Sequence, residues 1–234
     1  MEEKILLRTE NVSRVFHVGK TDVHALNDIS FTIKEGGLTI LNGKSGSGKT
    51  TLINQLSALD RPTSGKIWFE DKELTALSEK ARDNIRRTRM GIVFQSIALI
   101  STMTALENVE FGLRVAGVPA AGRRERAMEC LNYVGLGKRA SHMPQEMSGG
   151  EQQRVAIAKA IAHRPSIIFA DEPTAQLDSQ MGLQVVNVFK QLIKEQGTTI
   201  IMTTHDPDLL QIADAVLTLQ DGCLANETKG VEKS

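Results

Sequence analysis

One glycine-rich segment has the residue types and the spacing needed to bind phosphate groups. Residues 43–50 read Gly-Lys-Ser-Gly-Ser-Gly-Lys-Thr, which fits the pattern G-x-x-x-x-G-K-[ST] of a phosphate-binding loop. The glycines let backbone N–H groups point inward at phosphate oxygens, while Lys49 would reach the β- and γ-phosphates and the Thr50 hydroxyl would bind Mg²⁺. The alternative is a glycine-rich turn with a chance Lys-Thr pair. We predict a phosphate site formed by Gly43, Lys44, Ser45, Gly46, Ser47, Gly48, Lys49, Thr50 and Thr51.

Two adjacent carboxylates follow a second apolar run. Residues 167–170 are Ile-Ile-Phe-Ala, and Asp171 and Glu172 come directly after them. Ligands of open α/β folds bind at the carboxyl ends of the strands, so these acids would stand at that edge. Asp171 would then help to hold Mg²⁺ and Glu172 would act as general base on the attacking water. The alternative is a solvated strand end before the Pro173 turn.

A second helix start also suits an anion. Residues 148–152 read Ser-Gly-Gly-Glu-Gln and precede an apolar helical pattern. Ser148 with Glu151 fits a capping box, which is a purely structural explanation for those two residues. It does not explain Gly149 and Gly150, because glycine is costly in a helical turn. We therefore predict that a ligand approaches this backbone closely.

The pattern around these segments predicts strands that alternate with helices. Apolar, β-branched runs predict strands at 5–15, 23–33, 38–41, 66–70, 90–94, 167–170, 198–203 and 215–219. Helical spacing predicts helices at 50–59, 78–89, 104–115, 123–134 and 148–162, and over the stripe from Leu183 to Ile193. This alternation favours an α/β fold with a mainly parallel sheet, and residues 97–162 read as an inserted helical subdomain.

Composition narrows the function classes. The 234 residues are 41% hydrophobic and 24% charged, which is typical of a folded globular protein. The 28 basic and 28 acidic residues cancel, which argues against a nucleic-acid partner. The two cysteines, Cys130 and Cys223, are expected to be reduced thiols. The acidic N-terminus does not resemble a signal peptide and no apolar run is long enough to span a bilayer, so a partner would supply any membrane part.

Taken together, these motifs resemble those of ATP-binding-cassette (ABC) ATPases. The resemblance rests on residues 43–50, 148–152 and 167–172 in that order, and it extends over about residues 5–227. The segments 91–95, 104–109 and 149–158 are more closely similar to the ATPases of lipoprotein-release, macrolide-export and antimicrobial-peptide-resistance transporters. The resemblance implies a single ABC ATPase domain over residues 1–228 with a tail at 229–234. It also implies an N-terminal antiparallel β subdomain, the inserted helical subdomain, and ATP with Mg²⁺ as the ligands.

The resemblance also implies roles for four further residues. Gln95 matches the glutamine that contacts Mg²⁺ and the attacking water, and His205 matches the histidine that contacts the γ-phosphate. Asp178 matches the loop aspartate that reaches the partner subunit, and Phe16 stands where an aromatic ring stacks on adenine. Phe16 replaces the more usual tyrosine. Each has a plainer alternative, respectively a strand cap, a helix start, a helix N-cap and a core residue.

The implied mechanism is that of a transport motor. Two copies would pack head to tail, with each ATP between residues 43–50 of one copy and 148–152 of the other. Residues 97–162 would contact a separate integral membrane permease, which would place the chain at the cytoplasmic face of the cell membrane. The alternatives are a cell-division ATPase that regulates a permease, a DNA-repair or ribosomal ABC protein, and a small-molecule kinase. The basic cluster Lys80, Arg82, Arg86, Arg87 and Arg89 is either a solvated helix face or a contact for the permease or anionic lipid.

Overall fold

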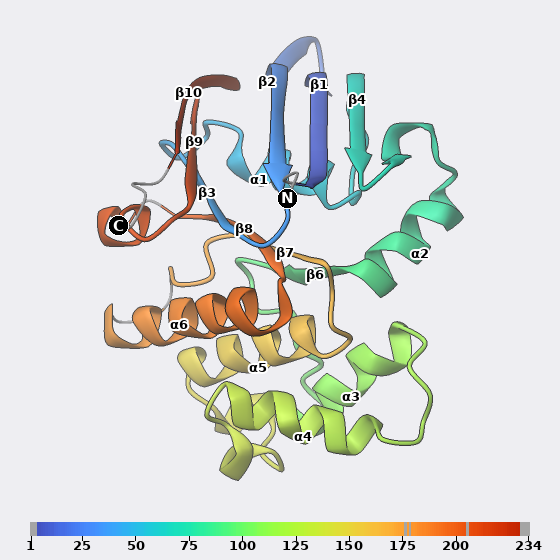
Figure 1. Cartoon of the computed structure of the whole chain (residues 1–234), viewed down its shortest axis with the longest axis vertical. Coiled ribbons are helices and arrows are strands. Elements are labelled where there is room, and N and C mark those ends of the chain that lie inside the picture. Colours follow the sequence, from blue (N-terminus) through green and yellow to red (C-terminus); the bar gives the residue numbers. More distant parts are fainter. Residues whose placement is uncertain (1–3, 176, 178, 205, 230–234) are drawn as a thin grey trace. The chain divides into compact units, whose positions relative to one another are not determined.

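The structure is a computed structural model that describes residues 4–175, 177, 179–204 and 206–229. The chain divides into two compact units (Figure 1). The first unit comprises Met1–Asn84 and Thr199–Ser234, and the second comprises Ile85–Thr198. None of the helices formed by the described residues is long and apolar enough to cross a membrane.

The first unit contains an antiparallel sheet, as the resemblance implied. Its strands, in the order β2-β1-β4-β5, are β1 (Ile5–Val18), β2 (Thr21–Lys34), β4 (Ser64–Phe69) and β5 (Lys72–Glu73). Along β2, Ile29, Phe31 and Ile33 are buried while the residues between them are exposed. This alternation is expected for a strand with one face in the core. A short 3₁₀ helix, Leu74–Ala76, follows β5.

A second group of strands in the first unit positions the phosphate loop. Here β3 (Leu38–Asn42) pairs in parallel with both β8 (Thr199–Thr203) and β9 (Ala215–Gln220). Helix α1 (Lys49–Leu56) starts seven residues after β3 ends, and α7 (Pro207–Leu210) lies between β8 and β9. The pattern did not predict β10 (Cys223–Lys229), which pairs antiparallel with β9. The turn before it is Asp221-Gly222, a typical hairpin dipeptide, and both residues have positive φ.

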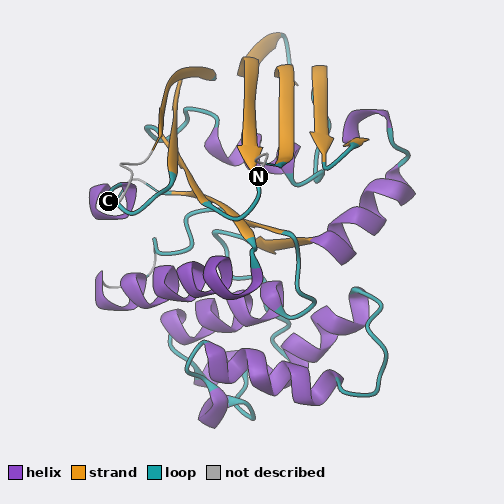
Figure 2. Cartoon of the chain, viewed as in Figure 1, coloured by secondary structure: helices purple, strands orange, loops and turns teal. Residues whose placement is uncertain are grey.

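The second unit combines two parallel strands with helices. Strand β6 (Met90–Val93) pairs with β7 (Ile167–Ala170), and β7 is buried over its whole length. The helices are α3 (Ala105–Val115), α4 (Arg123–Tyr133), α5 (Gly149–Ile161) and α6 (Ser179–Gln196), with 3₁₀ turns at Gly137–Arg139 and Pro144–Glu146 (Figure 2). Helices α3, α4 and α5 pack against one another. The predicted subdomain, residues 97–162, lies within this unit, and its boundaries stay a prediction.

Two expectations about local structure need correction. Helix α1 ends at Leu56 and not at residue 59, because Ala58 adopts a left-handed conformation with φ 59°. Helix α2 (Glu79–Arg89) is not a uniformly solvated basic face, since Arg82 is only 3% exposed. Its guanidinium donates to the carbonyls of Ala58 and Asp60, both in the first unit. Charge spacing along the sequence does not reveal that one member of this basic cluster is buried against backbone carbonyls.

Candidate nucleotide site

The phosphate loop folds back on its own lysine. Nζ of Lys49, at the start of α1, donates to the carbonyl oxygens of Gly43 at 2.7 Å and Lys44 at 3.1 Å. Lys49 and Ser47 are buried, whereas the segment from Lys44 to Gly46 is exposed. Two backbone carbonyls of the loop thus hold the Lys49 ammonium group, while residues 44–46 face solvent.

Glycines are required in this loop by close approach of other backbone. A Cβ on Gly43, where φ is 147°, would lie 2.4 Å from the carbonyl oxygen of Leu219. A Cβ on Gly48, where φ is 104°, would lie 2.6 Å from the carbonyl oxygen of Ala25. The N–H of Gly222 donates to the carbonyl of Ser47 at 3.2 Å. Strands β2 and β9 and the β9–β10 turn therefore support the loop from outside.

The loop residues fit a bound triphosphate. Ser47 Oγ is buried and makes no hydrogen bond with any of the described residues. The N-cap of α1 is Gly48, which has no side chain with which to cap the helix start. N–H groups at a helix start together with a lysine suit negatively charged phosphate. Thr50 is exposed beside them, as a hydroxyl ligand of Mg²⁺ would need to be.

Phe16 lies near the end of β1, where it pairs with Val23 of β2. Its ring is 37% exposed, so the core-residue alternative is wrong. The guanidinium of Arg14 stacks on it, with Cζ 4.4 Å from the ring centroid. The ring therefore keeps surface on which a flat group could stack.

The second unit brings Gln95 and Glu172 together. Nε2 of Gln95, just beyond β6, donates to Oε2 of Glu172, just beyond β7, at 3.2 Å. Asp171, only 7% exposed, is fixed by its N–H, which donates to the carbonyl of Val93. Glu172 has φ 45°, a left-handed conformation that costs a non-glycine residue about 1 kcal/mol. Parallel pairing of β6 with β7 brings an amide and two carboxyl groups to one sheet edge.

The start of α5 is a complete capping box. Ser148 Oγ accepts from the N–H of Glu151 at 3.2 Å, and the Ser148 N–H donates to Oε2 of Glu151 at 2.9 Å. Arg139 pairs with the same carboxylate at 3.1 Å. The Ser148 hydrogen bond, and then the Arg139 charge, lower the pKa of Glu151 below its usual 4.5. The structural explanation for Ser148 and Glu151 is therefore confirmed.

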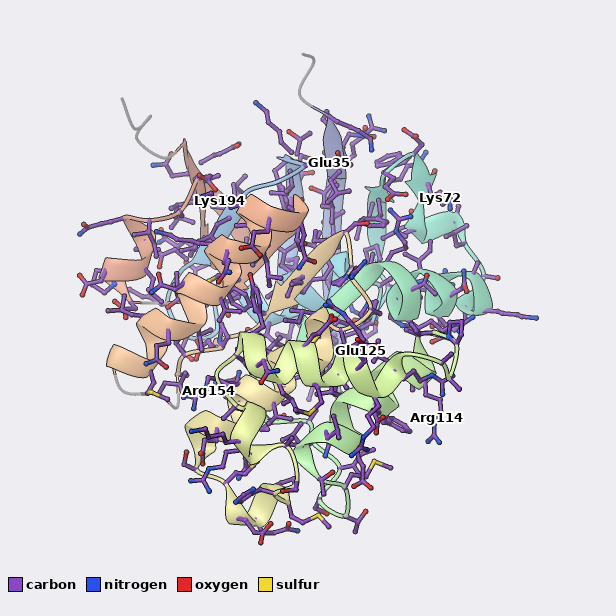
Figure 3. All side chains as sticks on the ribbon, turned by 60° about the horizontal axis from the view of Figure 1, so that its bottom comes forward. Glu35, Lys72, Arg114, Glu125, Arg154 and Lys194 are labelled. Atoms are coloured by element: carbon purple, nitrogen blue, oxygen red, sulfur yellow. The ribbon has the colours of Figure 1, made fainter. Side chains whose placement is uncertain are left out.

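The two glycines after this cap have different surroundings. A Cβ on Gly150 would lie 3.1 Å from Cδ2 of Leu177, so packing within the chain favours a small residue there. A Cβ on Gly149 would meet no atom within 4 Å. Further along α5 lies Arg154, which is labelled in Figure 3. Its Nη1 donates to Sδ of Met181 on α6 at 3.6 Å. Nothing described in this chain therefore requires a glycine at residue 149.

Two residues that the resemblance singled out, Asp178 and His205, lie outside the described residues. The expected roles of Asp178 at a partner subunit and of His205 at the γ-phosphate stay predictions.

A family comparison now identifies the class of protein. The profile of the family described as "ABC transporter" matches residues 26–175, which is more than half of the chain. The chain belongs to the ABC transporter family. This family explains why a phosphate loop, a capped glycine helix start and an acidic strand end occur in one sequence. The predicted fold class, a P-loop ATPase of ABC type, is confirmed.

Individual relatives agree with this assignment. The chain is 43% identical to the ABC transporter ATP-binding protein MJ1508 of Methanocaldococcus jannaschii over 217 residues, which cover 93% of this chain and 96% of the relative. It is 42% identical to the macrolide export ATP-binding/permease protein MacB of Syntrophobacter fumaroxidans over 97% of this chain but only 32% of that protein. A structure of the MJ0796 cassette, described as a dimeric post-hydrolysis state bound to ADP and Pi, superposes with a TM-score of 0.92. That structure is 38% identical and covers 97% of this chain and 100% of its own.

The chain is accordingly an ATP-binding subunit of the ABC transporter type and an ATPase, and its ligands are ATP and Mg²⁺. Two residues near Phe16 carry no motif signal in the sequence. They are Arg14, which stacks on Phe16, and Asp60, which pairs with Arg14. The Asp221-Gly222 dipeptide is a hairpin signal that could have predicted the turn against the phosphate loop.

Proposed function

We propose that the chain powers a membrane transporter of the export, lipoprotein-release or peptide-resistance type. In this proposal a separate integral membrane permease selects the cargo, and the chain works as a head-to-tail dimer that closes on ATP. The similarity to MacB, a macrolide export protein with ATP-binding and permease parts, supports the export class. The MJ0796 structures, described as dimeric, support the dimer.

In the proposed site each residue acts on the phosphates, the base, the metal ion or the attacking water. Residues 43–51 hold the phosphates, Lys49 neutralises the β- and γ-phosphates, and Phe16 stacks on adenine. Thr50, Gln95 and Asp171 hold Mg²⁺, which neutralises charge on the phosphates when bound. Glu172 accepts a proton from the attacking water, and the Gln95 amide orients the carboxylate through their 3.2 Å hydrogen bond. His205 contacts the γ-phosphate.

The observation that carries the dimer is Gly149. It begins a capped helix, none of the described residues fills the space beside it, and glycine there costs about 0.5–1 kcal/mol relative to alanine. Such a position is explained by an anion that approaches from another molecule, because a helix start attracts negative charge. We assign Ser148, Gly149, Gly150 and Glu151 to the ATP bound on a second copy, and Asp178 to the same interface.

A substitution of the general base tests the proposal. Glu172→Gln keeps the hydrogen-bonding shape but cannot take a proton, so ATP turnover should fall by about 100-fold or more. Because ATP then persists, the variant should elute as a dimer in gel filtration with MgATP. Glu125→Gln changes an exposed carboxylate on α4 of the same unit and is the matched control (Figure 3). Wild-type turnover of Glu172→Gln would refute the assignment of the base.

The permease partner also needs its own test. We propose that residues 97–162 form the helical subdomain that contacts it, at the cytoplasmic face of the cell membrane. A tagged chain extracted from membranes with mild detergent should retain an integral membrane protein through affinity purification. If the chain is recovered only from the soluble fraction after membranes are pelleted, it is not bound to a permease. The chain would then be an ATPase that works without a membrane partner.

A further inference from the structure

Arg14 is held in an unusually defined position beside Phe16. Its Nε lies 2.8 Å from Oδ2 of Asp60, and its Nη2 donates to Oδ1 of the same carboxylate at 3.2 Å. The Nη2 contact is a hydrogen bond, whereas the Nε contact is an ion pair without hydrogen-bond geometry, and together they restrict where the guanidinium can lie. In that position the guanidinium covers the Phe16 ring at 4.4 Å.

Asp60 is itself anchored by groups on each side. Nε2 of Gln55, a buried residue of α1, donates to Oδ2 at 2.9 Å, and the N–H of Arg61 donates to Oδ1 at 2.7 Å. The Asp60 carbonyl accepts from the buried guanidinium of Arg82. The carboxylate therefore cannot turn away from Arg14 without breaking its hydrogen bonds with Gln55 and with the Arg61 N–H, while Arg82 holds the backbone of Asp60.

This arrangement connects the two ends of the proposed nucleotide site. Helix α1 begins with Lys49 in the phosphate loop, contributes Gln55 in its last turn, and is followed by Asp60. The sequence of contacts Gln55, Asp60, Arg14, Phe16 therefore links the phosphate-binding helix to the ring at the end of β1. All of these residues belong to the first unit.

We propose that Arg14 and Asp60 are positioning residues for adenine recognition. Arg14 covers one face of Phe16 and restricts the ring, so that its exposed surface meets the base with little further loss of side-chain freedom. The cation also attracts the π-system of the ring, which holds the two groups together. The proposal rests on the proposed stacking of adenine on Phe16. Phenylalanine has no hydroxyl with which to fix its own ring, which makes an external support more important.

The test compares ATP with tripolyphosphate, which has the phosphates but no base. Both would displace fluorescent mant-ATP from the purified full-length chain in the presence of Mg²⁺, giving one inhibition constant for each competitor. Arg14→Gln and Asp60→Asn should each raise the inhibition constant of ATP about threefold to tenfold and leave that of tripolyphosphate unchanged. The double variant should bind ATP no more weakly than either single variant, because each single substitution already breaks the Arg14–Asp60 pair. Arg14→Lys, which keeps the charge but not the planar fork, should behave like Arg14→Gln.

Arg8→Gln is the matched control. Arg8 lies on the same strand, stacks on Trp68 at 4.0 Å and pairs with Glu10 at 3.0 Å, so its loss removes a similar contact away from Phe16. It should leave both constants unchanged. Equal weakening of ATP and tripolyphosphate in the Arg14 and Asp60 variants, or no weakening of either, would overturn the positioning role. Phe16→Ala separates the two proposals. If Phe16→Ala binds ATP with wild-type affinity, adenine does not stack on Phe16. If Phe16→Ala binds ATP more weakly but Arg14→Gln binds it normally, only the positioning role of Arg14 is refuted.

Discussion

At the scale of single residues, Gly43 is where backbone geometry and phosphate binding depend on each other most directly. Its φ of 147° and the 2.4 Å approach of a Cβ to the Leu219 carbonyl leave no room for a side chain. Gly43→Ala should therefore lower the free energy of unfolding by about 2–3 kcal/mol and abolish ATP binding. Urea unfolding and mant-ATP titration would measure the two effects.

Gly19→Ala provides the comparison for that experiment. Gly19 also has positive φ, at 63°, but a Cβ there would meet nothing within 4 Å. The substitution should cost about 1 kcal/mol from the left-handed conformation alone and leave ATP affinity intact. If both variants lost only this small amount, the close packing of the phosphate loop against β9 would be wrong.

His163 gives the protein a defined response to acid. Burial lowers its pKa below the usual 6.5, although the contact of Nε2 with the Met90 carbonyl at 3.1 Å opposes the shift. The unfolded chain thus takes up the proton first as the pH falls. The stability contributed by neutral His163 should be complete above about pH 6.5 and decrease as the pH drops toward the lower, folded pKa.

Urea unfolding at pH 7.5 and 5.5 would measure this effect. His163→Gln should reduce the difference in unfolding free energy between the two pH values, whereas the same substitution at the exposed His24 should leave it unchanged. An unchanged difference in His163→Gln would show that other groups cause the acid response.

At the scale of elements, two helices of the second unit begin with the same device. Helix α3 starts with Thr104 and Glu107, and α5 starts with Ser148 and Glu151, each pair forming a full capping box. Thr104→Ala and Ser148→Ala should each cost about 1 kcal/mol in unfolding free energy. Only Ser148→Ala should also reduce ATP turnover, about tenfold, because only that cap belongs to the proposed nucleotide site. If the two variants turn over ATP at equal rates, Ser148 only caps its helix and does not take part in the nucleotide site.

At the scale of the whole molecule, a nucleotide shared by two copies makes thermal stability depend on protein concentration. MgATP at 100 times its dissociation constant should stabilise Glu172→Gln by about 2.7 kcal/mol through binding alone. If a dimer encloses the nucleotide, the melting temperature with MgATP should also depend on the protein concentration. It should rise as the protein is concentrated from about 1 μM to about 50 μM, because a higher concentration favours the dimer. A melting temperature that rises with MgATP but not with protein concentration would indicate binding by single copies.

Much of the site could be predicted because its signals are local. Residues 43–50 must turn and then start a helix, and residues 167–172 must end a buried strand in carboxylates, whatever the rest of the chain does. The parallel pairing of β6 with β7 that joins Gln95 to Glu172 is different, because 77 positions separate the two residues. Their 3.2 Å contact follows only from the register of Val93 opposite Ala170.

The sequence alone determined the residue types for phosphate, metal and proton transfer, the order of the elements and the two glycine-rich helix starts. Its hydrophobic pattern also determined most strands and helices, since these depend on neighbours a few residues apart. Only the tertiary structure decided that Arg82 is buried, that Arg14 and Asp60 support Phe16, and that the β9–β10 turn supports the phosphate loop. The physical reason is that a buried charge or a stacked ring is stable only with partners distant in sequence, and spacing along the chain does not reveal which partners the fold will supply.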